Sequence, residues 1–110
     1  MPDQTTILVT GASGRTGRAV ISALQKHDVK IRAYIRREEV AEELKTLGAD
    51  EIALGDLFDF NILEEAVAGC SHVIHICPPM DPRETELAKK ITNFSLKKGV
   101  SRLLLYSVLH

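Results

Sequence analysis

Short apolar runs alternate with segments of helical periodicity along the whole chain. Five runs have the length and the nearly continuous apolar character that are typical of buried strands, and they cover residues 6–10, 30–35, 51–54, 72–77 and 102–109. Strands that are apolar on both faces are found mainly in parallel sheets that are covered by helices on both sides. The pattern therefore favours a buried parallel sheet.

Four segments between these runs carry apolar residues at helical spacing. They follow the first strand or begin near residues 38, 61 and 84, and the last three end at Gly48, Gly69 and Gly99. In the third segment, Asn61 is followed three positions later by Glu64. This spacing is that of a capping box and predicts that Asn61 is the N-cap of the helix.

Five strands separated by four helices predict an α/β fold with a doubly wound parallel sheet, that is, a Rossmann fold. Right-handed crossovers favour the strand order 3-2-1-4-5, with the first two helices on one face and the last two on the other. A chain of 110 residues supplies enough core for one domain. We therefore expect residues 1–110 to form a single domain whose sheet ends with strand five.

Three glycines follow the first expected strand at intervals of three residues. Gly11 allows a tight exit from the strand, Gly14 lets the backbone approach a pyrophosphate, and Gly17 lets the helix pack closely on the sheet. The hydroxyls of Ser13 and Thr16 add donors. The candidate cofactor-binding residues of this turn are Gly11, Ala12, Ser13, Gly14, Arg15, Thr16 and Gly17. The alternative is a turn that needs a positive φ and binds nothing.

Two arginines follow the second expected strand, where the adenosine ribose of a dinucleotide is recognised. An acidic residue at this place accepts hydrogen bonds from the ribose of NAD, whereas a basic residue meets the 2′-phosphate of NADP. Arg36 and Arg37 therefore favour NADP over NAD, and Arg15 can reach the same phosphate from the glycine turn. In the alternative interpretation the two arginines are solvated and pair with Glu38 or Glu39.

The ends of the third and fourth expected strands supply the other candidate contacts. Asp56 can accept a hydrogen bond from the adenine amino group, and Leu57 can pack on the ring; helix N-capping by Asp56 is the alternative. Ile76, Cys77 and Pro78 end the fourth strand on the other side of the crevice. We expect them to border the nicotinamide half of the cofactor, with Cys77 facing the site.

The string VTGASGRTGRAV, followed by IRAYIRR and GDLFD, resembles the atypical short-chain dehydrogenase/reductases, most closely the NmrA-like group. The resemblance extends over nearly the whole chain. It implies that residues 1–110 are an NAD(P)-binding domain, truncated after strand five, that lacks the C-terminal substrate-binding part. It implies that Gly11, Gly14 and Gly17 hold the pyrophosphate, that Arg36 selects NADP, and that Asp56 contacts adenine.

Catalytic members of this superfamily have a Ser at the end of strand five and a Tyr-x-x-x-Lys pair on the next helix. Ser107 matches the first element and is a weak catalytic candidate. The pair is absent, because Glu38 follows Tyr34 and His110 follows Tyr106 at the fourth position. Whether the chain is an enzyme is therefore left open.

Charge and cysteine content argue against several other classes of protein. Lys and Arg total 14 against 15 Asp and Glu, so no basic field attracts nucleic acid or an anionic membrane. Cys70 and Cys77 do not have zinc-site spacing, and we expect no metal. His72 and His75 lie in an apolar strand and are expected to be packed rather than to be ligands. The chain has no apolar run of membrane-spanning length, and we expect a cytoplasmic protein.

The last apolar strand is expected to lie at an uncovered edge of the sheet. Unpaired backbone groups beside Leu103, Leu104, Leu105 and Val108 invite pairing with another strand. This favours a homodimer, or else a fragment of a longer chain.

Three functions agree with these features. The first is NADP(H) binding of the NmrA-like type, with a redox-sensing or regulatory role. The second is an NAD(P)H-dependent oxidoreductase that acts on a small carbonyl or quinone. The third is an interaction module that binds no nucleotide.

Overall fold

The computed structural model describes residues 5–77 and 81–107 and contains one five-stranded parallel sheet. Its strand order is β3-β2-β1-β4-β5, as predicted. The elements are β1 (Thr5–Val9), α1 (Arg15–Leu24), β2 (Val29–Ile35), a 3₁₀ turn η1 (Glu38–Val40), α2 (Ala41–Leu47), β3 (Glu51–Leu54), α3 (Phe60–Val67), β4 (His72–Cys77), α4 (Glu84–Lys97) and β5 (Arg102–Ser107).

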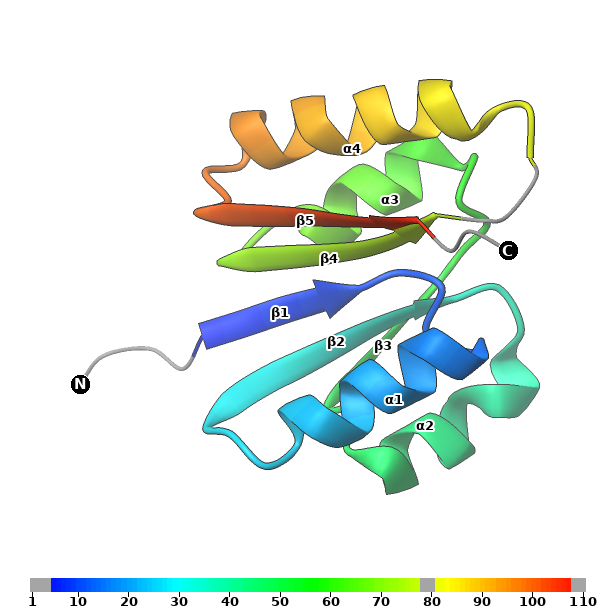
Figure 1. The fold of residues 1–110 in the computed structure, drawn as a ribbon, viewed down its shortest axis with the longest axis vertical. Helices are drawn as coiled ribbons and strands as arrows, with labels where there is room; N and C mark the ends of the chain where they lie inside the picture. The colour runs from blue at the N-terminus through cyan, green and yellow to red at the C-terminus, as the bar shows by residue number, and fades with distance from the viewer. Residues whose placement is uncertain (1–4, 78–80, 108–110) are drawn as a thin grey trace.

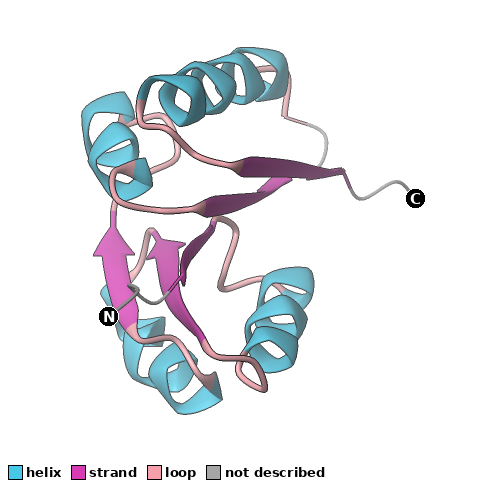
Figure 2. Ribbon diagram, turned by 90° about the vertical axis from the view of Figure 1, so that its left-hand side faces the viewer, coloured by secondary structure: helices cyan, strands magenta, loops and turns pink. Residues whose placement is uncertain are grey.

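The helices lie in two layers with the sheet between them (Figures 1 and 2). Alternate residues of β1 point to opposite faces, so that Ile7 and Val9 pack with α1 and α2 while Leu8 packs with α3 and α4. Both faces of the central strand are thereby buried, and the predicted arrangement of the four helices is confirmed.

The expected bounds of β3 and β4 agree with the structure, whereas the predicted start of the third helix is wrong. Helix α3 begins at Phe60, because the carbonyl of Asp59 accepts the N–H of Leu63 at 3.0 Å. Asp59 is therefore the N-cap, and Asn61 lies in the first turn. The second predicted helix begins as the 3₁₀ turn η1, and residues 108 and 109 of the predicted last strand lie outside the described residues.

The turn between β1 and α1 is compact because α1 presses directly on it. Gly11 has a φ of +61°, which favours glycine. A Cβ on Gly17 would lie 2.2 Å from the carbonyl oxygen of Gly11 and 2.6 Å from the Cα of Ala12. Backbone hydrogen bonds from Gly14 to Gly11 (3.2 Å) and from Arg18 to Gly14 (3.0 Å) complete the turn. The close contact at Gly17 and these hydrogen bonds together fix the start of α1 against the end of β1.

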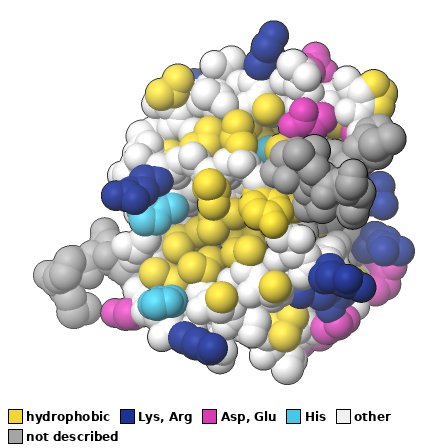
Figure 3. All heavy atoms as spheres, viewed as in Figure 1, with side chains coloured by type: hydrophobic (Ala, Val, Ile, Leu, Met, Phe, Trp, Pro, Cys, Tyr) yellow, Lys and Arg dark blue, Asp and Glu magenta, His cyan; other side chains and the backbone are white. Residues whose placement is uncertain are grey.

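Strand β5 forms an edge of the sheet among the described residues, and the sheet is partly uncovered there. Leu104 is 54% exposed and Tyr106 is 46% exposed. On the α1 side a shallow apolar groove runs over Ile7, Leu24, Ile74 and Leu104, and Figure 3 shows an apolar area in the middle of this face. The expected uncovered edge is therefore present.

We predict that Gly17→Ala destabilises the fold. Helix propensity alone would favour alanine by about 1 kcal/mol. The contact of the new methyl group with the backbone of Gly11 and Ala12 outweighs this gain, and a net loss of roughly 2 kcal/mol is expected in urea unfolding.

Gly14→Ala is the matched control, because a Cβ there would lie at 3.5 Å from the Gly11 carbonyl oxygen, an ordinary contact. Its cost should be limited to the poorer N-cap, about 1 kcal/mol or less. Equal stability losses in the two variants would contradict the packing argument.

Candidate functional site

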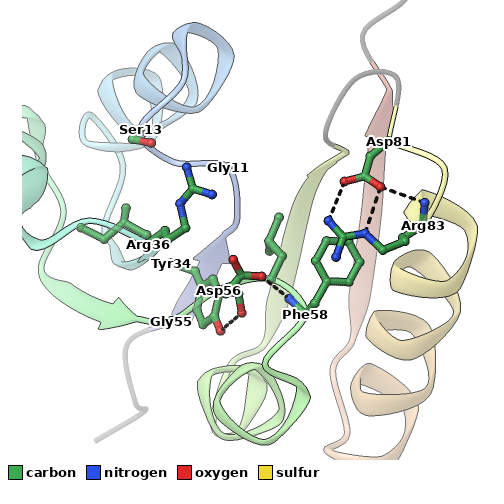
Figure 4. Close-up of a pocket in the computed structure, with 11 residues that line it drawn as sticks. Gly11, Ser13, Tyr34, Arg36, Gly55, Asp56, Phe58, Asp81 and Arg83 are labelled. Atoms are coloured by element: carbon green, nitrogen blue, oxygen red, sulfur yellow. Dashed lines mark hydrogen bonds and ion pairs between the residues drawn. The ribbon is translucent and has the colours of Figure 1, made fainter.

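A pocket lies at the carboxyl ends of the strands, where the chain leaves β1, β2 and β3 (Figure 4). In a doubly wound sheet this edge is the usual place of a ligand, near the point where the strand order reverses. The lining residues are Gly11, Ser13, Tyr34, Ile35, Arg36, Gly55, Asp56, Leu57, Phe58, Asp81 and Arg83. Five of the residues predicted from the sequence are thus brought together, namely Gly11, Ser13, Arg36, Asp56 and Leu57.

The N-terminus of α1 opens beside the glycine turn. Gly14 is its N-cap, no side chain caps the helix, and its first turn contains no acidic residue. The first amides of a helix have no intrahelical acceptor and carry partial positive charge, so they favour an anion. Arg18 stabilises the turn by donating from Nε to the carbonyl of Ser13 at 2.8 Å, and it also pairs with Glu43. A side chain of α1 itself therefore stabilises the turn that precedes the helix.

Gly14 differs from the other two glycines of the turn. Its φ of −79° is accessible to any residue, and a Cβ would meet only the Gly11 carbonyl oxygen at 3.5 Å. Neither backbone conformation nor internal packing therefore requires a glycine here. The preference of an N-cap for glycine over alanine and the close approach of a ligand to the backbone are the remaining physical reasons for a glycine at this position.

Arg36 projects from the end of β2 into the same pocket (Figure 4). Neither Arg36 nor Arg37 forms an ion pair with Glu38 or Glu39, although all four side chains are described and exposed. Arg37 and Arg15 are exposed and do not line the pocket. Arg36 is thus a cation that lines the pocket beside the glycine turn and forms no ion pair among the described residues.

Asp56 organises the turn after β3. Its Oδ1 accepts the N–H of Phe58 at 2.9 Å, and its carbonyl accepts the hydroxyl of Tyr34 at 2.8 Å. The N-cap of α3 is Asp59, so the alternative that Asp56 caps the helix is not observed. Tyr34 is buried, and burial together with the nearby charges of Asp59 and Asp56 raises its pKa to about 12. Tyr34 therefore supports the pocket and is a poor proton donor.

Several predicted residues lie outside the pocket. Ala12 is fully buried, and Gly17 is buried against the turn. Ile76 and Cys77 are buried at the end of β4, and burial together with a hydrogen bond to Glu84 raises the pKa of the Cys77 thiol to about 12. The side chain of Cys77 is buried, and its place beside the nicotinamide half of the cofactor stays a prediction.

The other residues predicted from the sequence are Thr16, Pro78 and Ser107. Thr16 is half-buried in the first turn of α1 and does not line the pocket. Pro78 lies outside the described residues. The backbone of Ser107 pairs in register with Cys77, which places it at the carboxyl end of β5.

Sequence reasoning missed the far wall of the pocket. Tyr34 and Phe58 line the pocket and were not predicted to do so. Asp81 and Arg83, which were also not predicted, belong to the connection between β4 and α4. The Asp-x-Arg spacing is a local signal, because the backbone N–H of Arg83 donates to Asp81 Oδ1 at 2.8 Å. Nothing in the sequence indicated that this pair would lie against the turn after β3.

A buried polar pair joins β1 to β4 directly below the glycine turn. The hydroxyl of Thr10 accepts the N–H of Ile76 at 3.1 Å, so its own hydrogen is free to donate to Nδ1 of His75 at 2.6 Å. Both side chains are fully buried, and Nε2 of His75 has no partner among the described residues. Burial lowers the pKa of His75 to about 4, and the charge of Glu84 only partly opposes this effect. His75 is therefore neutral and packed, as expected.

The described part of the chain holds neither a metal cluster nor a membrane-spanning helix. No group of three or more His, Cys, Asp or Glu residues with a metal-binding arrangement occurs there. Among the same residues, no helix is both long enough and apolar enough to span a membrane.

The sheet order, the glycine turn and the pocket beside it define a dinucleotide-binding protein of the Rossmann class. Residues 11–110 match the NAD(P)H-binding protein family, and the chain belongs to that family. This match confirms, at the level of the family, the resemblance drawn from the sequence.

Several relatives and solved structures of similar sequence are reductases by name. The chain is 40% identical over 78 residues, 71% of its length, to a 4-hydroxy-2-methyl-3-oxo-4-farnesyl-3,4-dihydroquinoline-1-oxide ketoreductase from Stigmatella aurantiaca, of which it covers 23%. Triphenylmethane reductase from Citrobacter sp., solved with NADP(H), superimposes with a TM-score of 0.79 and 28% identity over 91% of this chain and 36% of that one.

The NADPH-dependent quinone oxidoreductase QOR2 from Escherichia coli, solved with NADPH, superimposes with a TM-score of 0.80 and 27% identity over 94% of this chain and 37% of that one. The chain therefore spans between 23% and 37% of the length of these proteins.

We predict that His75 makes stability depend on pH in the weakly acidic range. Its pKa is about 4 in the folded protein, against an ordinary value of 6.5, so the unfolded chain binds a proton that the folded chain excludes. The free energy of unfolding should fall as the pH decreases from 6.5 to 4, since each unit of pKa difference corresponds to about 1.4 kcal/mol. His75→Asn, which does not titrate, should flatten this slope in urea unfolding.

His27→Asn is the control for this measurement, because His27 is exposed at the end of α1. It should leave the slope of the wild type unchanged. The assignment to His75 fails if both variants have the same dependence on pH as the wild type.

Proposed function

We propose that this chain binds NADP(H) along the carboxyl edge of its sheet and is the cofactor-binding part of a reductase-type protein. One observation carries the proposal: Arg36, a cation without an acidic partner among the described residues, opens into the same pocket as the glycine turn at the start of α1. The amides favour the pyrophosphate. A guanidinium favours the 2′-phosphate, because it presents a planar set of donors to phosphate oxygens.

The residues present fit the cofactor. The space over Gly14 suits the approach of a phosphate to the backbone, since a Cβ there would fill it without meeting more of the protein than the Gly11 carbonyl. Ser13 adds a hydroxyl at the same end of the pocket. Leu57 and Asp56 line the part of the pocket after β3, where they are suited to an adenine ring and its amino group.

The bound nicotinamide would supply hydride transfer, and the chain's own residues would bind and orient it. Tyr34 is held by the carbonyl of Asp56 and stays protonated, so it does not serve as the acid of a carbonyl reduction. No Tyr-x-x-x-Lys pair occurs in the sequence, although Ser107 remains a weak candidate for contact with a reacting group. A sensing or regulatory role, in which the chain binds the cofactor without turnover, is the first candidate.

A reductase activity is the second candidate, and the comparisons favour it. The relatives and structural neighbours described above are named as a ketoreductase, a triphenylmethane reductase and a quinone oxidoreductase. Because the chain covers about a third of each neighbour or less, we place the substrate-binding part in further sequence of a longer polypeptide. Oxidation of NADPH in the presence of a quinone distinguishes this candidate from binding without turnover.

The uncovered face of β4 and β5 supports a further part of the proposal. Leu104 and Tyr106 are about half exposed on an edge strand, which favours cover by the rest of a longer chain or by a second copy. Light scattering separates the two, because only the second gives twice the mass of the chain. Both cysteines are free thiols, which agrees with the cytoplasmic location that we propose.

We predict that Arg36→Ala weakens NADPH far more than NADH. A charge-assisted contact with a phosphate is worth about 2 kcal/mol, so the loss for NADPH should be tenfold or more, with little change for NADH. Fluorescence titration of the purified chain with each reduced dinucleotide measures both affinities.

Gly14→Ala is the matched control, since its Cβ enters the space proposed for the pyrophosphate that both cofactors share. It should weaken NADPH and NADH to the same degree. Equal losses for the two cofactors in Arg36→Ala would contradict the assignment of Arg36, and a wild-type chain that binds neither would overturn the proposed function and leave the interaction module.

A further inference from the structure

Arg83, the N-cap residue of α4, forms the wall of the pocket opposite the glycine turn and Arg36 (Figure 4). Asp81 holds its side chain, with Arg83 Nε 3.3 Å from Oδ1 and Nη2 3.2 Å from Oδ2. The backbone N–H of Arg83 donates to the same carboxylate at 2.8 Å. The two hydrogen bonds from the guanidinium fix its plane, and the backbone hydrogen bond holds the carboxylate in place.

The ring of Phe58 lies against one face of this guanidinium. The central carbon of the guanidinium of Arg83 is 3.7 Å from the centroid of the ring, which is a close cation–π contact. Phe58 is itself held, because its N–H donates to Asp56 and its ring meets Phe60 edge to face at 6.2 Å. Two chain connections, after β3 and after β4, thus build one layered surface at the side of the pocket.

The two arginines of the pocket differ in charge environment. Asp81 neutralises Arg83, and this pairing lowers the pKa of the Asp81 carboxyl and raises that of the guanidinium; Asp56 adds to the latter effect. Arg36 has no such partner among the described residues. A phosphate dianion is therefore attracted to Arg36, while Arg83 offers mainly a flat surface.

The in-plane edge of the Arg83 guanidinium is occupied by Asp81, and one of its faces is covered by Phe58. The side chain is nevertheless 60% exposed, so the opposite face is open. Guanidinium planes stack on aromatic rings, and nucleobases are ligands of this kind. The position beside Asp56 and Leu57 puts this open face at the part of the pocket suited to adenine.

Resting on the proposed function, we propose that Arg83, oriented by Asp81 and backed by Phe58, is a specificity-determining residue that binds the adenine ring by stacking. The base then lies between this surface and the turn at Asp56 and Leu57. Arg83 recognises the base shared by NADP and NAD, whereas Arg36 recognises the phosphate that distinguishes them.

The test compares ligands that carry or lack the adenine ring. Binding of ADP, nicotinamide mononucleotide, NADPH and NADH is measured by calorimetry for the purified wild-type chain and for Arg83→Ala. The variant should bind ADP about tenfold more weakly, because stacking and cation–π contacts of a base are worth about 1–2 kcal/mol. NADPH and NADH should lose affinity by the same factor, and nicotinamide mononucleotide should be unaffected.

Two further variants make the test specific. Arg83→Lys keeps the charge but not the plane, so it should lose most of the affinity for ADP. Phe58→Leu keeps an apolar residue but removes the ring beneath the guanidinium, and it should also weaken ADP. It provides a second route to the answer if Arg83→Ala does not fold, as judged by circular dichroism.

The outcomes are distinguishable. If the wild-type chain binds none of the adenine nucleotides, the proposed function fails, and this inference fails with it. If the wild type binds ADP and the folded variants bind it equally well, only the stacking role of Arg83 is overturned. A loss confined to NADPH would likewise overturn it, because Arg83 would then contact the 2′-phosphate.

Discussion

The close contact between α1 and the glycine turn is the constraint on which the rest of the site depends. Gly17 is pressed against the carbonyl of Gly11 at a distance that excludes any side chain. This contact sets where the axis of α1 meets the end of β1, and thereby where its first free amides point. Because an amide dipole acts over a few ångströms, a helix displaced by the width of a methyl group would no longer direct these donors at the same point of the pocket.

The polar pair of Thr10 and His75 supports the same turn from below. It joins Thr10, the residue that follows β1, to β4 at the place where the strand order reverses. A neutral imidazole tolerates full burial, but its Nε2 hydrogen has no acceptor among the described residues, which costs about 1–3 kcal/mol. A strand made only of aliphatic residues would avoid this cost, so the pair is better explained by the position it gives to the start of the glycine turn than by stability.

Most of the fold could be predicted from the sequence because its signals are local. The apolar runs of β3 and β4 marked their bounds, since polar residues, glycine or proline flank them. The start of α3 could not be fixed in this way, because Asp59 and Asn61 are both good N-caps and packing decides between them. The place of the glycine turn and of Arg36 at this edge of the sheet could also be predicted, since each directly follows a strand in the sequence.

The far wall of the pocket could not be predicted, because its contacts join distant parts of the chain. Tyr34 reaches the carbonyl of Asp56 across 22 positions of the sequence. Phe58 meets Arg83 only because the strand order brings the ends of β3 and β4 to the same edge of the sheet. Periodicity predicts which face a residue occupies, but it does not predict which neighbour it meets there.

The two arginines of the pocket offer a ligand different features: Arg36 a charge that is unpaired among the described residues, and Arg83 a flat guanidinium face. Two guanidinium groups without carboxylate partners would both attract a phosphate. A dinucleotide would then have no preferred direction in the pocket. Asp81 removes this ambiguity, since it cancels the charge of Arg83 while leaving a face of its plane open. The remaining charge of Arg36 lies on the side of the glycine turn, and the flat surface lies on the side of Phe58. Under the proposed function, a dinucleotide would therefore bind in one orientation, because only its adenosine end carries a phosphate ester beside a purine.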